Sequence, residues 1–133
     1  MIKQPNWRTK LARYLLDNQH RPFEWGAFDC CLFAADALKI QTGQDYAEAF
    51  RGRYKTELGA ARALKRYGSG TLEDTLDQIL GAGQNGVLRD GDITLNNTEN
   101  GPAVGVFYSG VIWVPGETKL QHIRTQPIKF WRF

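Results

Sequence analysis

The fold is decided by the stretch Phe23-Glu24-Trp25-Gly26-Ala27-Phe28-Asp29-Cys30-Cys31-Leu32-Phe33-Ala34-Ala35-Asp36, where a loop becomes an apolar, alanine-rich helix. Small alanine side chains let a sheet approach a helix closely, so we expect this helix to be buried against a sheet. The same stretch places Cys30 at the helix N-terminus. Unpaired backbone N–H groups and the positive end of the helix dipole favour a thiolate there, which makes Cys30 a candidate nucleophile.

Helical patterns fill the first two-thirds of the chain. Asn6 is the expected cap of the first helix, and Gly43 suits the left-handed residue after the second. Thr71 and Asp74 have a spacing similar to that of a capping box at the start of the fourth. We expect helices over residues 7–17, 29–43, 56–67 and 71–81.

Strand-rich segments fill the last third, after Gly91. Ser109-Gly110 fits a two-residue hairpin turn between two of them. We expect strands over residues 92–95, 103–108, 111–114, 119–124 and 129–133. Helices followed by strands predict one α+β domain, residues 1–133, in which N-terminal helices pack on a C-terminal antiparallel sheet of about four or five strands.

Composition excludes several classes of protein. With 42% hydrophobic and 23% charged residues, the chain has the composition of a globular domain, and no segment approaches the roughly 20 apolar residues of a membrane span. The chain start lacks the features of a secretory signal. The two adjacent cysteines and the isolated His20 and His122 match no zinc-ligand spacing, so we expect reduced thiols, synthesis in the cytoplasm, no metal and no cofactor.

Several motifs resemble the NlpC-type, papain-like cell-wall peptidases. These are Trp25-Gly26 and Asp29-Cys30 before the helix, Gly91-Asp92 before a strand, and the strand Ala103-Val104-Gly105-Val106. The resemblance implies a papain-like fold with Cys30 as nucleophile. The family's general base is a histidine that opens the strand reading His-Val-Gly-Ile, and Ala103 stands at that position.

The missing histidine dominates the functional expectation, because a Cys-His mechanism needs an imidazole that takes the thiol proton and returns it to the leaving group. The third polar residue of the family would fall near residues 113–115, where nothing suitable stands. Taken end to end, the chain resembles more closely a phage-encoded family of unknown function with this fold. That resemblance implies a product of a tail gene cluster and a place in the virion.

Each candidate site residue has two interpretations. Cys30 is either a nucleophile or a small apolar side chain on a buried helix stripe. His122 is either a relocated base or a structural or exposed strand residue. Trp25 and Gly26 either shape a binding groove beside Asp29 or cover the helix end and permit a tight turn.

We therefore expect a structural component of a phage tail tip or baseplate, with a degenerate papain-like fold and other tail proteins as partners. The alternative is an active cysteine peptidase or amidase that cleaves peptidoglycan peptides during phage entry, with Cys30 as nucleophile. A third possibility is a nucleic-acid-binding accessory protein that uses the basic residues between Arg51 and Arg66. The lack of a groove-reading motif favours a solvated helix face instead. The net charge of +3 is a mild excess that identifies no acidic partner.

Overall fold

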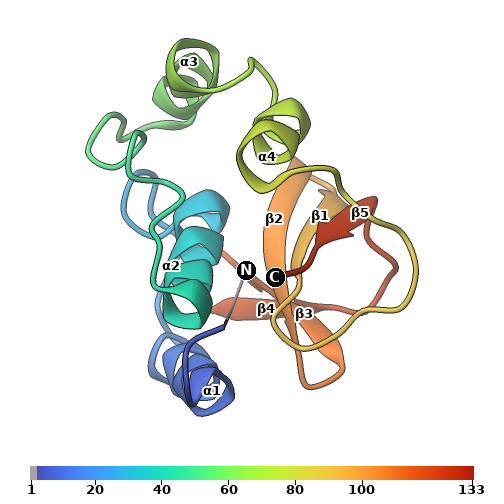
Figure 1. The fold of residues 1–133 in the computed structure, drawn as a ribbon. Coiled ribbons are helices and arrows are strands. Elements are labelled where there is room, and N and C mark those ends of the chain that lie inside the picture. Colours follow the sequence, from blue (N-terminus) through green and yellow to red (C-terminus); the bar gives the residue numbers. More distant parts are fainter. Residues whose placement is uncertain (1–2) are drawn as a thin grey trace.

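A computed structural model describes residues 3–133, in which helices precede strands along the chain (Figure 1). The α+β class expected from the sequence is confirmed. The helices are α1 (Trp7–Asp17), α2 (Cys30–Thr42), α3 (Glu57–Tyr67) and α4 (Leu72–Leu80). The strands are β1 (Ile93–Thr98), β2 (Gly101–Tyr108), β3 (Val111–Pro115), β4 (Leu120–Ile123) and β5 (Lys129–Trp131).

Side-chain caps fix the start of three helices. The Asp29, Thr56 and Thr71 side chains accept hydrogen bonds from backbone N–H groups in the first turns of α2, α3 and α4. Gly43 ends α2 in the left-handed conformation, with φ of 82°, as expected. Asn6 occupies the expected N-cap position of α1, but it has φ of 59° rather than an extended backbone, and its side chain forms no cap hydrogen bond.

The five strands form one antiparallel sheet in the order β4-β3-β2-β1-β5. Ser109 and Gly110 form the expected two-residue turn between β2 and β3, and their φ values of 53° and 84° suit a primed hairpin turn. The β1–β2 hairpin extends further than the sequence indicated, since Thr98 pairs with Gly101 across its tip.

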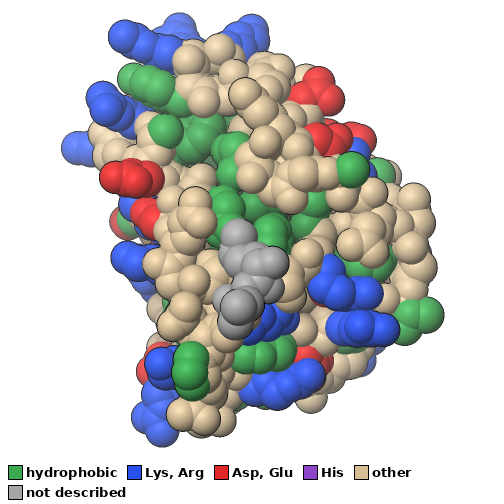
Figure 2. Space-filling view, viewed as in Figure 1, with side chains coloured by type: hydrophobic (Ala, Val, Ile, Leu, Met, Phe, Trp, Pro, Cys, Tyr) green, Lys and Arg blue, Asp and Glu red, His purple; other side chains and the backbone are tan. Residues whose placement is uncertain are grey.

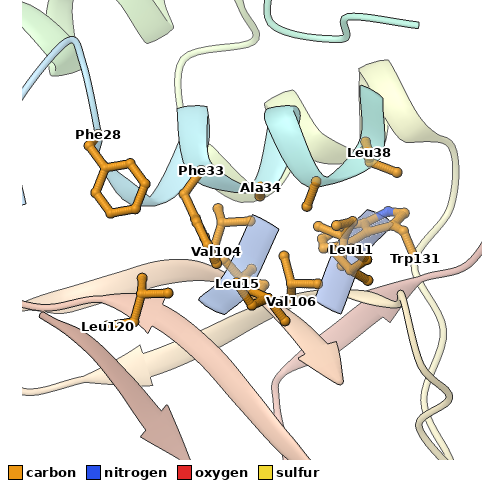
Figure 3. Packing of buried hydrophobic residues seen from close by; sticks show 13 residues of the cluster. Leu11, Leu15, Phe28, Phe33, Ala34, Leu38, Val104, Val106, Leu120 and Trp131 are labelled. Carbon is orange, nitrogen blue, oxygen red and sulfur yellow. The ribbon is translucent and has the colours of Figure 1, made fainter. Parts of the chain in front are cut away.

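The core lies between the sheet and the first two helices (Figure 3). Phe33 of α2 points towards Val104 of β2, and Leu15 of α1 lies beside Val104. Leu38 and Val106 belong to the same buried cluster. The α2 helix is buried on most of its circumference, including Ala34, Ala35 and Ala37. Small side chains on a central helix thus allow close packing against both α1 and the sheet.

The β5 edge of the sheet is paired with a loop. The long connection from α4 to β1 wraps past β5 (Figure 1), and Gln84 exchanges backbone hydrogen bonds of 2.8 and 3.0 Å with Phe130.

The helices α3 and α4 bury few of their side chains: Ala63 is the one buried side chain of α3, and Thr75 is that of α4. The apolar stripes of these two helices therefore remain partly accessible.

Candidate functional site

The start of α2 is organised by the Asp29 carboxylate, which is 1% exposed. Its Oδ1 accepts from the Leu32 N–H at 2.9 Å, and its Oδ2 accepts from the Gly26 N–H at 3.0 Å and from the Tyr54 hydroxyl at 2.5 Å. Burial and the neighbouring Asp29 carboxylate raise the pKa of the Tyr54 phenol well above its usual range. Tyr54 therefore stays a hydrogen-bond donor, and Asp29 is fully engaged as a structural cap.

Cys30 and Cys31 occupy the first turn of α2, and both are half-buried free thiols. A hydrogen bond from the Cys31 thiol lowers the pKa of Cys30, and a backbone hydrogen bond from Val104 acts in the same direction, against the effect of burial. The same bond and burial raise the pKa of Cys31. Of the two thiols, Cys30 is the one prepared to lose its proton.

These thiols line a cleft of about 430 Å³. Its walls come from α2, α3 and α4, and its floor comes from β1 and β2. Figure 2 shows apolar side chains gathered in the hollow between these helices, with Lys and Arg side chains above it on the α3 side. A cleft of this size lies within the range of about 300–1,000 Å³ that is common for small-molecule sites.

Neither histidine of the chain lines this cleft. His122 lies on β4, is exposed, and packs edge-on against Trp113 with 4.2 Å between ring centroids. His20 is exposed after the end of α1. Among the side chains that line the cleft, Glu57 at the exposed mouth is the one carboxylate besides the engaged Asp29. The arrangement thus lacks an imidazole beside the Cys30 sulfur.

The strand position expected for the base faces away from the cleft. Pro102 and Val104 line the cleft, and Val104 belongs to the core under α2. Because side chains alternate along a strand, Ala103 points to the other face of the sheet. This differs from the alignment expected from the family resemblance, in which residue 103 would face Cys30.

Trp25 and Gly26 stand beside the helix start. The Trp25 side chain lines the cleft, is 36% exposed and contacts Phe23 edge-on. Gly26 has φ of 80°, and a Cβ atom added there would lie 2.1 Å from the Tyr54 carbonyl oxygen. Trp25 therefore borders the cleft, whereas Gly26 permits the close approach of two chain segments.

Some of the basic residues between Arg51 and Arg66 form ion pairs or ring contacts, and others are exposed to solvent. Arg51 bonds to Asp36 at 2.6 Å and to Asp45 at 2.7 Å, which neutralises its charge locally. Arg53 lies over the Tyr67 ring. Arg62 and Lys65 are exposed on α3, and neither forms an ion pair within residues 3–133.

Across residues 3–133, the geometry indicates neither a metal site nor a membrane-spanning helix. Within the described part of the chain, no three His, Cys, Asp or Glu side chains are grouped so that they could hold a metal ion. In that same part, every helix is too short or too polar to cross a bilayer.

Two parts of the site escaped the sequence analysis. Tyr54 is one of them, because no local signal in the sequence links it to Asp29, which is 25 positions away. The α4 stripe of Leu72, Leu76 and Ile79 has helical spacing and could have been identified as an apolar face. Nothing in the residue pattern indicates that this stripe lines the same cleft as Cys30.

Comparison with known proteins gives a family but no activity. A family described as "Domain of unknown function (DUF6950)" matches residues 2–133. No curated protein and no solved structure matches the chain.

Proposed function

Because the chain belongs to the DUF6950 family, whose description assigns no activity, we propose from the site itself that it is a non-catalytic papain-like domain. In this proposal it has the NlpC-like arrangement and serves as a structural component of a bacteriophage tail tip or baseplate. Other tail proteins are its partners, and the virion is its location.

The proposal that the domain is non-catalytic rests on one observation. The Cys30 thiol lies at a helix N-terminus in a cleft, as a nucleophile would, but no imidazole lines that cleft. Without a base, the thiol proton has no acceptor and the leaving group has no donor. Asp29 cannot substitute, because its carboxylate already accepts three hydrogen bonds that fix the helix start.

The phage-tail part is supported by the resemblance of the Asp29–Asp36 stretch, the Phe50–Tyr54 segment and the Ala103–Val106 strand to phage-encoded proteins of this type. Structural tail components act by holding neighbouring chains, which requires a stable fold and a specific surface but no chemistry. A site whose carboxylate stabilises the fold suits that role.

Two measurements test this proposal. Purified protein is incubated with peptidoglycan stem peptides, and we expect no cleavage above that of the Cys30→Ala variant. Virions of the phage that encodes the chain are then labelled with an antibody to it, and we expect the label at the tail tip. Cleavage that Cys30→Ala abolishes would refute the non-catalytic role, and unlabelled particles would refute the structural role.

An active cysteine peptidase or amidase that cleaves peptidoglycan peptides remains the second candidate. One observation favours it: the hydrogen bonds from Cys31 and Val104 lower the pKa of Cys30, and thiolate is the reactive form. Catalysis would still need a proton donor for the leaving group, such as a water molecule. Rapid alkylation of Cys30 in folded protein together with peptide cleavage would favour this candidate over the first.

A further inference from the structure

We propose that the cleft between α2 and the α3–α4 pair binds one long-chain fatty acid. The hydrocarbon chain would lie along the apolar walls, and the carboxylate would lie at the basic edge of α3. This inference goes beyond the proposed function and assigns a ligand class to the cleft beside Cys30.

The first argument is the apolar character of the walls. Three helices turn apolar stripes towards one hollow, and the stripes of α3 and α4 are only partly buried (Figure 2). Binding of a hydrocarbon chain is favourable because it removes the exposed apolar surface of partly buried leucine and isoleucine side chains from water. The walls include Ala35 and Leu38 from α2, Ala61 and Leu64 from α3, and Leu76 and Ile79 from α4.

The second argument excludes an extended peptide as the occupant. A peptide backbone needs partners for its N–H and C=O groups when it leaves water. The polar groups of Asp29 and Tyr54 are hydrogen-bonded to each other and are not available to a peptide. Thr75 Oγ1 is also engaged, because it donates to the Thr71 carbonyl at 2.6 Å and accepts from the Ser69 N–H at 3.0 Å. Among the other polar side chains that line the cleft, Tyr46 is half-buried and Glu57 and Asn100 are exposed at its mouth. A hydrocarbon chain has no N–H or C=O groups and needs no hydrogen-bond partners in the cleft.

The third argument is size. At about 430 Å³ the cleft has the volume of a small-molecule site. A partner helix is about 10–12 Å in diameter with its side chains and is usually bound along a groove several turns long. A single unbranched hydrocarbon chain is a small ligand of the kind that a site of this volume holds.

The fourth argument is the charge at the two edges. On α4, Glu73 and Asp77 are both paired with Lys129, at 2.9 and 2.7 Å. On α3, Arg62 and Lys65 are exposed, and no ion pair within residues 3–133 engages them. Glu57, at the start of α3 and at the mouth of the cleft, also forms no ion pair within residues 3–133. Arg62, Lys65 and Arg66 follow it along α3, so the second half of this helix is positive and favours an anionic headgroup at that end.

The test is a calorimetric titration of the folded chain with palmitate below its micelle concentration. We expect saturable binding of one palmitate per chain, and we expect bound palmitate to slow the alkylation of Cys30. The variant Ala61→Trp fills the cleft from an exposed position and should weaken binding by at least about tenfold, because a filled site resists further packing. The matched control Leu58→Trp adds the same side chain to the same helix at a position outside the cleft, and should bind normally.

A second pair of measurements tests the headgroup. Replacing Arg62 and Lys65 with glutamate should weaken palmitate binding but not the binding of a cationic amphiphile with the same chain length. The proposal is overturned if palmitate does not bind, if Ala61→Trp binds it as well as the wild type, or if an apolar helical peptide displaces it. None of these outcomes bears on peptide cleavage or on virion labelling, so failure here is distinguishable from failure of the proposed function.

Discussion

The Tyr54 hydroxyl donates a 2.5 Å hydrogen bond to Asp29 Oδ2, and this bond ties the segment before α3 to the first turn of α2. Asp29 is buried and caps α2, whereas Tyr54 borders the cleft. The same contact therefore stabilises the helix that carries Cys30 and fixes one wall of the candidate site.

Replacing Tyr54 with phenylalanine should lower the free energy of unfolding by about 1–2 kcal/mol, because a hydrogen bond to a buried carboxylate is lost while the ring is kept. The Gly26 N–H still donates to Oδ2, which limits the loss. Urea denaturation measures the difference. A change below about 0.5 kcal/mol would mean that this bond contributes less than an ordinary neutral hydrogen bond.

Gly26 should tolerate no side chain. Its φ of 80° is strained for other residues, and a Cβ atom would overlap the Tyr54 carbonyl oxygen. We expect Gly26→Ala to destabilise the fold by more than about 2 kcal/mol in thermal or urea denaturation. Gly52→Ala is the matched control, because Gly52 has φ of 75° but nothing within 4 Å of the added atom. Equal losses for the two variants would show that the steric contact with Tyr54 is unimportant.

Much of the helical part could be predicted because its signals are local. Gly43 and the threonines at 56 and 71 are residues that helix ends require, and each end lies within a residue or two of its expected place. Asn6 failed as a side-chain cap because cap geometry depends on the backbone conformation of the preceding chain, which the residue type does not determine.

The β1–β2 hairpin was underestimated because its stabilisation is not local. Asn96 is a poor strand former by type, yet it is 2% exposed and its amide donates to Thr94 Oγ1 at 2.9 Å and to the Ala103 carbonyl at 3.1 Å. These partners compensate for the burial of the amide N–H groups. The cleft escaped prediction for the same reason, since it depends on how α3 and α4 are placed over α2.

The Asp92–Arg132 pair should be the ion pair on which stability depends most. Asp92 is 1% exposed, and Arg132 reaches it with two bonds of 3.0 and 2.7 Å. Arg132→Ala should cost about 3 kcal/mol, because it leaves a buried carboxylate without its cation. The control Arg8→Ala breaks the exposed pair with Asp90 and should cost less than about 1 kcal/mol in the same denaturation experiment. Similar costs for both would contradict a special role of burial.

The reactivity of Cys30 should depend on the donor at position 31. The hydrogen bond from Cys31 lowers the pKa of Cys30, so thiolate forms, and iodoacetamide alkylation accelerates, at a lower pH than for a free cysteine with a pKa of about 8.5. Cys31→Ala removes the donor, and the midpoint of the rate against pH should rise. Cys31→Ser keeps a hydroxyl donor and should hold the midpoint low.

Each of these variants has a single thiol, so the alkylation rate measured by mass spectrometry belongs to Cys30 alone. The His122→Ala variant in the Cys31→Ser background should leave the midpoint unchanged, because His122 packs on Trp113 and does not line the cleft. A midpoint that rises with His122→Ala would instead reveal an imidazole acting on Cys30 and would favour the peptidase. A midpoint that is equal in the Ala and Ser variants would show that the dipole of α2 and the Val104 backbone control the thiol without Cys31.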